Sequence, residues 1–396
     1  MFPSIFVSFS LSLSLYLLSL LPTISSYPCI GVTYSPPSSN ATLTPSPDHI
    51  RSALRSLSIH SLRLQNSDPN LIRTFLYTNF SVFLTIPNHL VSAIATNRSD
   101  ATKWLYLHVI PFYPRVNITA ISVGNDFVDS SPESVDYLIP AVRNVYLSLR
   151  ELGIRNVSVS TSFSFVSVVT TLFPPSAAQF QDFPGVDLMG PLLQFLNETN
   201  SSFLINVYPY NLYRLNPEIP IGIALFQEAP FNFRDDYATG VRYRNLFDMM
   251  IDAVVSAMAA AGYDNVPIVV TETGWPSASS AGDEEEDANI EYAEMYLKGL
   301  VKHLKSGEGT PLRKEGIASV YVYELFDKEA AEEGTQPPGR RWGLLYPNLT
   351  KKYRIDFSGS SSSRAVLSDN GELQVRNQTG ISWVGGYADR ANFVMS

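Results

Sequence analysis

The 396-residue chain has few of the residues that several common kinds of site require. It contains a single cysteine, Cys29, so no disulfide can form within the chain and a packed core must supply its stability. Its five histidines occur without a His-Glu-x-x-His pattern or a cysteine pair, which argues against a metal site of the zinc type. Charged residues make up only 16% of the chain and the net charge is −9. A nucleic-acid partner needs basic patches and is therefore not expected.

The sequence also lacks a hydrophobic run long enough to span a bilayer. Residues 1–26 nevertheless contain a leucine-rich stretch from Leu11 to Leu21, followed by Pro22 and small residues up to Ser26. This pattern is typical of a secretory signal peptide. A membrane anchor is the alternative, but the stretch is too short and too rich in serine. The C-terminus has no hydrophobic tail for a glycolipid anchor. We therefore expect a secreted protein, in the extracellular space or cell wall, with no membrane anchor.

Asparagines in Asn-x-Ser/Thr sequons are unusually frequent. Each sequon alone is a weak signal, but their number favours a glycosylated surface on an exported protein. The nine candidates are Asn40, Asn79, Asn97, Asn117, Asn156, Asn197, Asn200, Asn348 and Asn377.

Short apolar runs alternate with amphipathic stretches along most of the chain, which is 45% hydrophobic. The runs are rich in β-branched and aromatic residues, as expected for strands that are covered on both faces. The amphipathic stretches, typical of helices, include 134–152, 243–261 and 290–305, and Gly262 is a plausible helix C-cap. The predicted strands are Cys29–Tyr34, Ile59–Leu64, Ser81–Ile86, Ile118–Val123, Val157–Thr161, Phe203–Tyr208, Pro267–Thr271 and Ser319–Leu325.

Eight strands with helices between them predict an α/β fold, the closed (β/α)8 TIM barrel, as a single domain over 27–357. An open sheet would be expected to carry a glycine-rich phosphate loop after its first strand. The sequence there, from Gly31 to Pro37, has no such pattern. Residues 358–396 begin with a serine-rich linker and are too few for a domain without disulfides or metal. The acidic run 283–287 is expected to be a solvated loop.

Functional groups in such barrels cluster where the strands end at their carboxyl edge. Two carboxyl groups occupy such positions, Asp126 after the fourth strand and Glu272 at the end of the seventh. Tyrosines and Trp275 follow several of the same strands. Glycosidic-bond hydrolysis uses one carboxyl group as an acid and another as nucleophile or base, while aromatic faces pack on sugar rings. A helix cap is the alternative role for Asp126.

Several blocks in order make the chain resemble glycoside hydrolase family 17, the plant endo-1,3-β-glucanases. The resemblance covers residues 30–357. The blocks are Ile30-Gly-Val-Thr-Tyr34, Thr85-Ile-Pro-Asn88, Val123-Gly-Asn-Asp126, Asn206-Val-Tyr-Pro-Tyr210, Asn245-Leu-Phe-Asp248, Val269-Val-Thr-Glu-Thr-Gly-Trp-Pro-Ser277, Leu325-Phe-Asp327 and Trp342-Gly-Leu-Leu-Tyr-Pro347.

The resemblance implies roles for individual residues. Glu272 would be the nucleophile, and the cleft would contain Tyr34, Asn125, Tyr208 and Trp275. The proton-donor position of the family, a glutamate, is held here by Asp126, whose side chain is shorter by roughly 1.5 Å, one C–C bond.

Two supporting acids of the family are also replaced, by Lys328 and Arg340. Glu324 and Glu329 are the nearby carboxyl groups that could compensate. Added positive charge near the cleft is expected to lower carboxyl pKa values. An exposed loop position is the simpler interpretation of Lys328, and a buried apolar position in the first strand is expected for Cys29.

The resemblance therefore implies a monomeric, secreted retaining hydrolase that cleaves β-1,3-glucan within the chain and needs no cofactor. The alternative is a glucan-binding protein on the same scaffold, whose altered acid machinery no longer supports turnover. An inert wall glycoprotein, which neither binds nor cleaves glucan, is a third interpretation.

Overall fold

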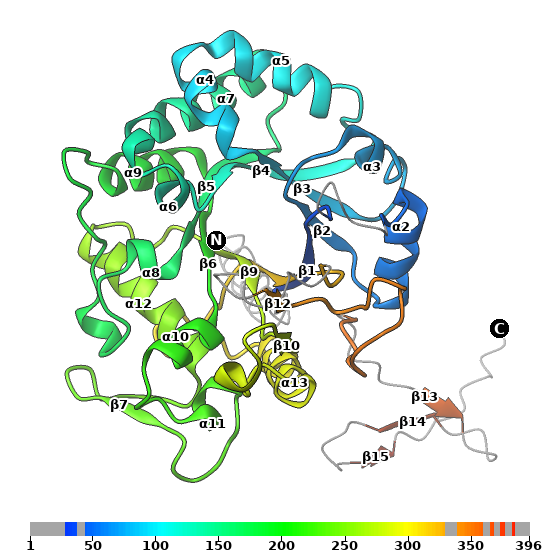
Figure 1. The fold of residues 1–396 in the computed structure, drawn as a ribbon, viewed down its shortest axis with the longest axis vertical. Coiled ribbons are helices and arrows are strands. Elements are labelled where there is room, and N and C mark those ends of the chain that lie inside the picture. Colours follow the sequence, from blue (N-terminus) through cyan, green and yellow to red (C-terminus); the bar gives the residue numbers. More distant parts are fainter. Residues whose placement is uncertain are drawn as a thin grey trace, which may run out of the picture. The chain divides into compact units, whose positions relative to one another are not determined.

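The computed structural model in Figure 1 describes residues 28–37, 44–328 and 339–358, and three short strands within 365–384. The predicted signal peptide over 1–26 lies outside the described residues, as do Asn40, Glu329 and Asn377. The chain forms two compact units, Met1–Phe357 and Ser358–Ser396.

Eight parallel strands of the first unit close into a barrel, which confirms the predicted (β/α)8 architecture. The strands are β1 (Cys29–Tyr34), β2 (Ser61–Leu64), β3 (Ser81–Ile86), β4 (Asn117–Asn125), β5 (Ser158–Ser164), β6 (Phe203–Asn206), β9 (Ile268–Thr273) and β11 (Ser319–Tyr323). They follow one another around the barrel in chain order, and β11 pairs with β1 to close it. The predicted strand over 203–208 ends early because Pro209 begins a helix there.

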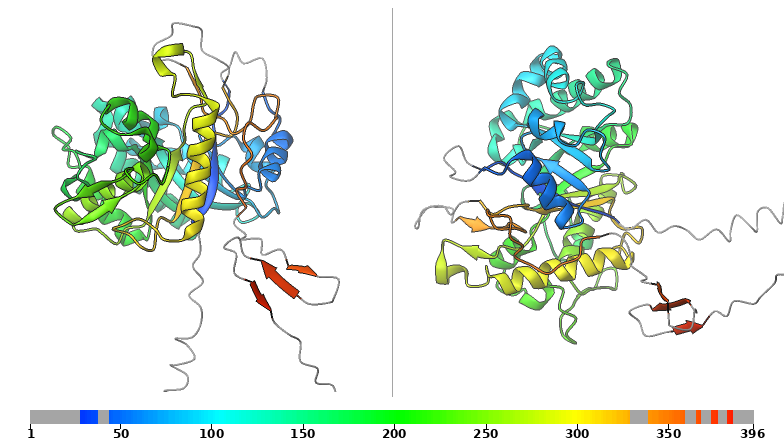
Figure 2. Two further views of the ribbon diagram at one scale, coloured as in Figure 1. Left: turned by 90° about the horizontal axis from the view of Figure 1, so that it is seen from below. Right: turned by 90° about the vertical axis from the view of Figure 1, so that its right-hand side faces the viewer.

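Helices surround the barrel, and Figure 2 shows the long α13 running alongside the strands on its outer face. The helices are α2 (Pro47–Ser56), α3 (Pro69–Arg73), α4 (Val91–Thr96), α5 (Arg98–His108), α6 (Phe127–Ser130), α7 (Leu138–Glu151), α8 (Phe165–Val168), α9 (Met189–Thr199), α10 (Pro209–Leu215), α11 (Ile221–Ala224), α12 (Leu246–Ala260) and α13 (Ile290–Ser306). The predicted C-cap glycine after α12, Gly262, has φ +82°, a conformation that glycine adopts without strain.

Three small sheets complete the described structure. A hairpin of β7 (Arg234–Asp236) and β8 (Val241–Tyr243) precedes α12. β10 (Ala278–Ser279) pairs with β12 (Arg340–Arg341). The second unit contains an antiparallel sheet in the order β13 (Ala365–Leu367), β14 (Leu373–Arg376) and β15 (Ser382–Val384).

The interior of the barrel is filled in layers, which decides where polar side chains lie. Phe83, Leu204 and Tyr321 form an apolar cluster inside the barrel, distinct from the large core between the strands and the helices. Gly31 belongs to this layer, since a Cβ there would lie 2.6 Å from the Tyr321 ring. Strand side chains alternate between the two faces, so Asn206, two residues after Leu204, lies one layer nearer the carboxyl edge.

Cys29 departs from its predicted position, because it is exposed. It is the first residue of β1, at the amino end of the barrel, where the flanking core does not cover it. The remainder of β1 is buried as expected, from Gly31 to Tyr34. Among the described residues, no helix is both long enough and apolar enough to cross a membrane.

Candidate active site

Glu272 lies near the carboxyl end of β9, with only 4% of its surface exposed, and three donors surround its carboxylate. Arg63 Nη1 donates to Oε1 at 2.5 Å and Gln65 Nε2 donates to the same oxygen at 2.7 Å. The Tyr208 hydroxyl donates to Oε2 at 2.6 Å. The guanidinium of Arg63 forms a buried ion pair with this carboxylate. Donors on both sides therefore orient both carboxylate oxygens of Glu272.

Arg63 is the main residue of the candidate site that sequence reasoning missed. It is fully buried inside the barrel, and its second nitrogen, Nη2, donates to Asn125 Oδ1 at 2.7 Å. A signal for it was present, because Leu62 and Leu64 flank it in a strand that is covered on both faces. A cation that alternates with such residues must point into the barrel, where it needs an anionic partner.

Asp126 follows β4 in a left-handed conformation, with φ 48° and ψ 41°, and its N–H donates to the Ser162 carbonyl at 3.0 Å. It stands at the start of α6 but its side chain makes no capping hydrogen bond, so the alternative role as a cap is wrong. Instead, Asn206 Nδ2 donates to Asp126 Oδ1 at 2.9 Å. The backbone turn thus directs this carboxyl group towards the barrel axis, where Asn206 lies.

The environment of Asp126 raises its pKa to about 7. Burial is the largest cause, and the negative charge of Glu272 adds to it; the Asn206 hydrogen bond and the Arg63 charge act in the opposite direction. Against the larger effect of burial, the charge of Lys328 lowers the pKa of Glu324, as expected. At Asp126, burial and Glu272 outweigh the positive charge of Arg63. At neutral pH a large fraction of the protein molecules therefore carries on Asp126 the proton that an acid catalyst needs.

Two asparagines connect the acids. Asn206 pairs in register with Glu272 across β6 and β9, and its amide donates to both Asp126 Oδ1 and Asn125 Oδ1. Its own Oδ1 accepts a hydrogen bond from Thr271 at 2.7 Å. Asn125 Oδ1 is thus occupied, while its amide nitrogen has no partner within the described part of the chain. That nitrogen is free to donate to a ligand hydroxyl.

An aromatic wall borders the carboxylates. The Tyr208 ring lies 5.1 Å from the Trp342 ring and 6.0 Å from the Tyr323 ring, centroid to centroid. Trp342, which follows β12, is half-buried and was not among the predicted site residues. The motif Trp342-Gly-Leu carried the signal for it, since the segment returns to the barrel mouth. There the Glu324 N–H donates to the Trp342 carbonyl at 3.2 Å.

Trp275 and Tyr34, which were predicted to line the cleft, are buried and pack against other aromatic rings. Trp275 is only 1% exposed, packs against Tyr210 and Tyr296, and donates its indole N–H to the Asp287 carbonyl at 2.8 Å. Its ring is therefore packed among other aromatic side chains. Tyr34 is 6% exposed and packs edge-on against Phe326 at 6.3 Å.

Lys328 and Arg340, which replace two acids of the family pattern, both contact polar or acidic side chains. Lys328 donates to the Tyr323 hydroxyl at 2.7 Å and lies 3.8 Å from Glu324 Oε2, so it lies at the edge of the site rather than free in a loop. Arg340 makes a two-pronged ion pair with Glu285, at 2.6 and 2.8 Å. Glu285 is buried, so the prediction of a fully solvated acidic run is wrong at this residue.

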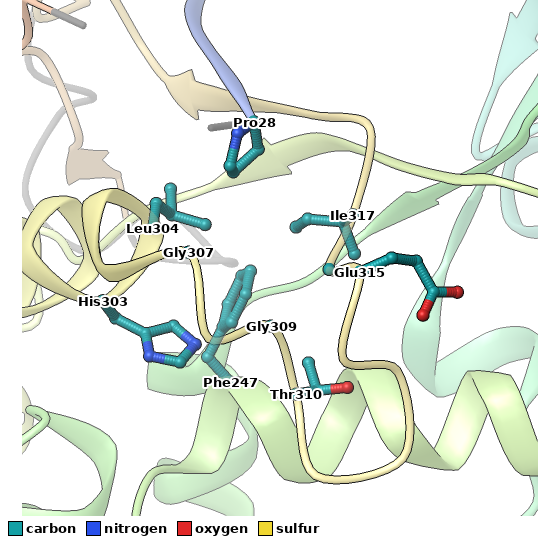
Figure 3. A pocket seen from close by; sticks show the side chains of 10 residues that line it. Pro28, Phe247, His303, Leu304, Gly307, Gly309, Thr310, Glu315 and Ile317 are labelled. Atoms are coloured by element: carbon teal, nitrogen blue, oxygen red, sulfur yellow. The ribbon is translucent and has the colours of Figure 1, made fainter. Parts of the chain in front are cut away.

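Two hollows near α12 and α13 differ from the barrel mouth. The one in Figure 3, bordered by Pro28, Phe247, His303 and Ile317, has a volume of about 30 Å³, room for little more than a water molecule. A neighbouring hollow of about 490 Å³ is lined by groups of both charges, and Lys302 and His303 there already pair with Glu228 and Asp248. The barrel mouth, by contrast, brings Asp126 and Glu272 close enough for the charge of Glu272 to raise the pKa of Asp126.

Comparison with known proteins supports this assignment. Residues 30–357 match the model of glycosyl hydrolases family 17. The Arabidopsis thaliana "Probable glucan endo-1,3-beta-glucosidase A6" is 34% identical over 337 residues, which cover 84% of this chain and 68% of the relative. "Glucan endo-1,3-beta-glucosidase 11" from the same plant is 35% identical, with 89% and 81% covered. Three further Arabidopsis relatives are longer, and the chain spans only 61–62% of their length.

A solved structure agrees with the sequence relatives. CJP38, a β-1,3-glucanase and allergen of Cryptomeria japonica pollen, superposes with a TM-score of 0.75 at 34% identity. The match covers 83% of this chain and 99% of that one. These findings confirm the resemblance inferred from the ordered motifs. The chain belongs to glycosyl hydrolases family 17, a family of glycosidases.

Proposed function

We propose that the protein is a retaining endo-1,3-β-glucanase in which Glu272 is the nucleophile and Asp126 the acid and base. The observation that carries this proposal is the difference between the two carboxyl environments. Three donors stabilise the charge of Glu272, whereas burial and the adjacent anion favour a proton on Asp126. A carboxylate that accepts hydrogen bonds at both oxygens suits the nucleophile, and a buried carboxyl group that keeps its proton suits the acid.

The proposed reaction has two steps. Glu272 Oε attacks the anomeric carbon while Asp126 transfers its proton to the glycosidic oxygen, so that the C–O bond breaks and a glycosyl-enzyme ester forms. Asp126, now ionised, then removes a proton from water, and the water oxygen attacks the same carbon and releases Glu272. Configuration at the anomeric carbon is retained because it inverts twice. Asn125 and the aromatic wall of Tyr208, Tyr323 and Trp342 would hold the sugar rings.

The substrate class comes from the relatives. The Arabidopsis relatives and CJP38 are named for activity on β-1,3-glucan. An internal, chain-cleaving mode agrees with the "endo" designation of the Arabidopsis proteins. We therefore propose a linear β-1,3-glucan as substrate.

The test is the release of oligosaccharides from soluble β-1,3-glucan by purified protein, with the configuration of the first products read by proton NMR. Wild type should release β-configured products, and Glu272→Gln should be at least a thousandfold slower because the nucleophile is lost. Asp136→Asn, at an exposed acid ten residues from Asp126, is the matched control and should retain activity. Initial products of α configuration would refute the retaining mechanism.

The shorter side chain of Asp126 favours a second candidate, a glucan-binding protein with little or no turnover. Both candidates predict binding, so the discriminating variant is Asp126→Glu, which restores the longer acid of the family pattern. If wild type binds glucan without cleaving it and Asp126→Glu cleaves, the binding function is supported. If wild type already cleaves, the hydrolase is supported, and failure of both binding and cleavage would leave only the wall glycoprotein.

We also propose export and N-glycosylation. Every sequon asparagine within the described residues is exposed, as an acceptor must be: Asn79, Asn97, Asn117, Asn156, Asn197, Asn200 and Asn348. Asn117 begins β4, and three others lie shortly before the starts of β3, β5 and β6, at the end of the barrel opposite the carboxylates. Glycans there would lie away from both carboxyl groups. Peptide mass spectrometry after enzymatic deglycosylation of protein secreted from plant cells would test both claims.

A further inference from the structure

Arg340 departs from the family pattern, and the proposed mechanism does not use it. Its guanidinium lies on Glu285, which is 4% exposed and ends the short 3-10 helix η4 (Gly282–Glu285). Arg340 Nη2 donates to Glu285 Oε1 at 2.6 Å, and Arg340 Nε donates to Oε2 at 2.8 Å. A two-pronged pair of this kind fixes orientation as well as distance. The pair therefore ties β12, which begins at Arg340, to η4.

The same guanidinium also contacts α10. Arg340 Nη1 donates to Asn211 Oδ1 at 3.4 Å, and Arg340 Cζ lies 5.3 Å from the centroid of the Tyr210 ring. The Tyr210 hydroxyl in turn donates to Glu285 Oε2 at 3.2 Å. Arg340 therefore joins three segments that are far apart in the chain, α10, η4 and β12.

Trp342 lies two residues after Arg340, and the two side chains share a face. Side chains alternate along extended backbone, so residues 340 and 342 point to one side and Arg341 to the other. The exposures agree, because Arg341 is exposed whereas Arg340 and Trp342 are half-buried. The Trp342 ring is edge-on to the Tyr210 ring, with the centroids 6.0 Å apart. Arg340 and Trp342 thus pack against the same buried ring.

A small sheet and the ion pair together hold the backbone before Trp342. β12 contributes two residues to an antiparallel ladder with β10, and the Ser277 N–H donates to the Arg341 carbonyl at 2.7 Å. A two-stranded ladder is at best marginally stable by itself. The ion pair of Arg340 therefore adds a side-chain anchor on the same face as the Trp342 ring.

Trp342 extends from this anchor to the candidate active site. Its ring lies 5.1 Å from the Tyr208 ring, centroid to centroid, and the Tyr208 hydroxyl donates to Glu272 Oε2 at 2.6 Å. A shift of the Trp342 ring would therefore change the apolar face that is offered to a sugar beside Glu272.

We propose that Arg340 and Glu285 are positioning residues that hold the Trp342 ring against Tyr210 and thereby set the affinity for a β-1,3-glucan chain. The effect on affinity rests on the proposed function, whereas the position of the ring does not. Because both residues act through Trp342 and not through the carboxylates, their loss weakens binding without slowing the chemical step.

The position of the ring can be tested without glucan, by fluorine NMR of protein that contains 5-fluorotryptophan. The resonance of Trp342 is identified by its loss in Trp342→Phe. Arg340→Met should shift and broaden this resonance, because methionine cannot pair with Glu285. Arg341→Met is the matched control, since it removes the same charge from the exposed neighbouring position, and it should leave the resonance unchanged. An unchanged resonance in Arg340→Met would overturn the proposal.

A double-mutant cycle tests the effect on affinity. The Kd for laminaripentaose is measured by titration calorimetry in the Glu272→Gln protein, so that the sugar is not cleaved. Arg340→Met should raise this Kd about fivefold when Trp342 is present and have no further effect in Trp342→Ala, because coupled residues are not additive. Glu285→Gln should behave in the same way. Equal effects with and without Trp342 would show a general structural loss and overturn the proposal.

Kinetics on soluble β-1,3-glucan provide a second measurement of the same role. Arg340→Met should raise KM and leave kcat within about twofold of wild type, the pattern expected when binding alone is weakened. A lower kcat at an unchanged KM would overturn the proposal.

Arg340→Lys keeps the test decisive if Arg340→Met fails to fold. Lysine retains a positive charge beside Glu285 but cannot form the two-pronged pair, so its Kd and KM should fall between those of wild type and Arg340→Met. If Arg340→Lys folds and both its resonance and its Kd equal those of wild type, the two-pronged pair does not position Trp342. If the parent protein does not bind laminaripentaose, the proposed function and the affinity role both fail, while the Trp342 resonance still decides whether Arg340 positions the ring.

Discussion

The guanidinium of Arg63 on β2 and the carboxylate of Glu272 on β9 meet across the inside of the barrel, at 2.5 Å, with side chains that are 0% and 5% exposed. Two strands, β1 and β11, separate β2 from β9 in the sheet, so the pair spans the interior. Burial makes each charge dependent on the other, because neither has solvent as a substitute. The ion pair therefore contributes both to the charge state of Glu272 and to the integrity of the barrel mouth.

Arg63→Met should abolish activity and lower stability. It leaves Glu272 buried without its cation, and breaking a buried ion pair from one side costs about 3–5 kcal/mol. Urea unfolding followed by fluorescence would measure the loss. Arg51→Met is the matched control, because Arg51 pairs with Asp48 at the surface, where such pairs contribute about 0–1 kcal/mol. Equal effects of the two variants would contradict the structural role of Arg63.

Substitutions beside Asp126 should shift the alkaline limb of the kcat/KM profile in opposite directions. Asn206 stabilises the charged form of Asp126, so Asn206→Ala should raise the pKa of Asp126 above about 7 and move the limb to higher pH, with a lower rate. The charge of Asp129 raises that pKa, so Asp129→Asn should move the limb to lower pH. Shifts in the same direction would refute Asp126 as the group that titrates.

Trp342→Ala should weaken glucan binding. The ring is half-buried and packs against Tyr208 and Tyr323 beside the carboxylates, so its removal takes away an apolar face for a sugar ring. We expect a Kd for laminaripentaose about tenfold higher by titration calorimetry, equivalent to about 1.4 kcal/mol. Tyr106→Ala, at an exposed tyrosine of α5, should leave the Kd unchanged. An unchanged Kd for Trp342→Ala would place the sugar elsewhere.

The pair of His303 and Asp248 should make stability depend on pH. His303 Nε2 lies 2.8 Å from Asp248 Oδ1, linking α13 to α12. Burial lowers the pKa of His303, but the Asp248 hydrogen bond and charge outweigh it, and the pKa is raised. A histidine whose pKa is raised on folding contributes a stabilisation that is fully present below its unfolded pKa of about 6.5. This stabilisation is lost as the pH rises through the pKa of the folded state.

His303→Gln should therefore destabilise the protein more at pH 5.5 than at pH 8.5. The comparison of Tm values for wild type and variant at the two pH values measures this. His49→Gln, at an exposed histidine of α2, provides the control and should show no such difference. A deficit that is the same at both pH values would mean that His303 is not charged in the folded protein.

Much of the fold was predictable because local patterns and global topology agree. Short apolar runs between amphipathic stretches gave all eight barrel strands, and the bounds of the predicted first and third strands are those of β1 and β3. The positions of Asp126 and Glu272 at strand ends followed from the same pattern. Trp275 shows where such reasoning fails: its neighbours in sequence lie at the strand end, yet its ring packs inward against Tyr210 and Tyr296.

The sequence by itself determined the alternation of strands and helices and the family, and it indicated Asp126 and Glu272 as candidate acids, because hydrophobic periodicity and residue type are local properties. Only the tertiary structure decided which groups surround those acids. Arg63, Gln65 and Glu324 come from segments far apart in the chain, and they meet because the barrel closes. Charge state depends on the distance to such partners and on burial, and neither quantity is written in the spacing of residues along a chain.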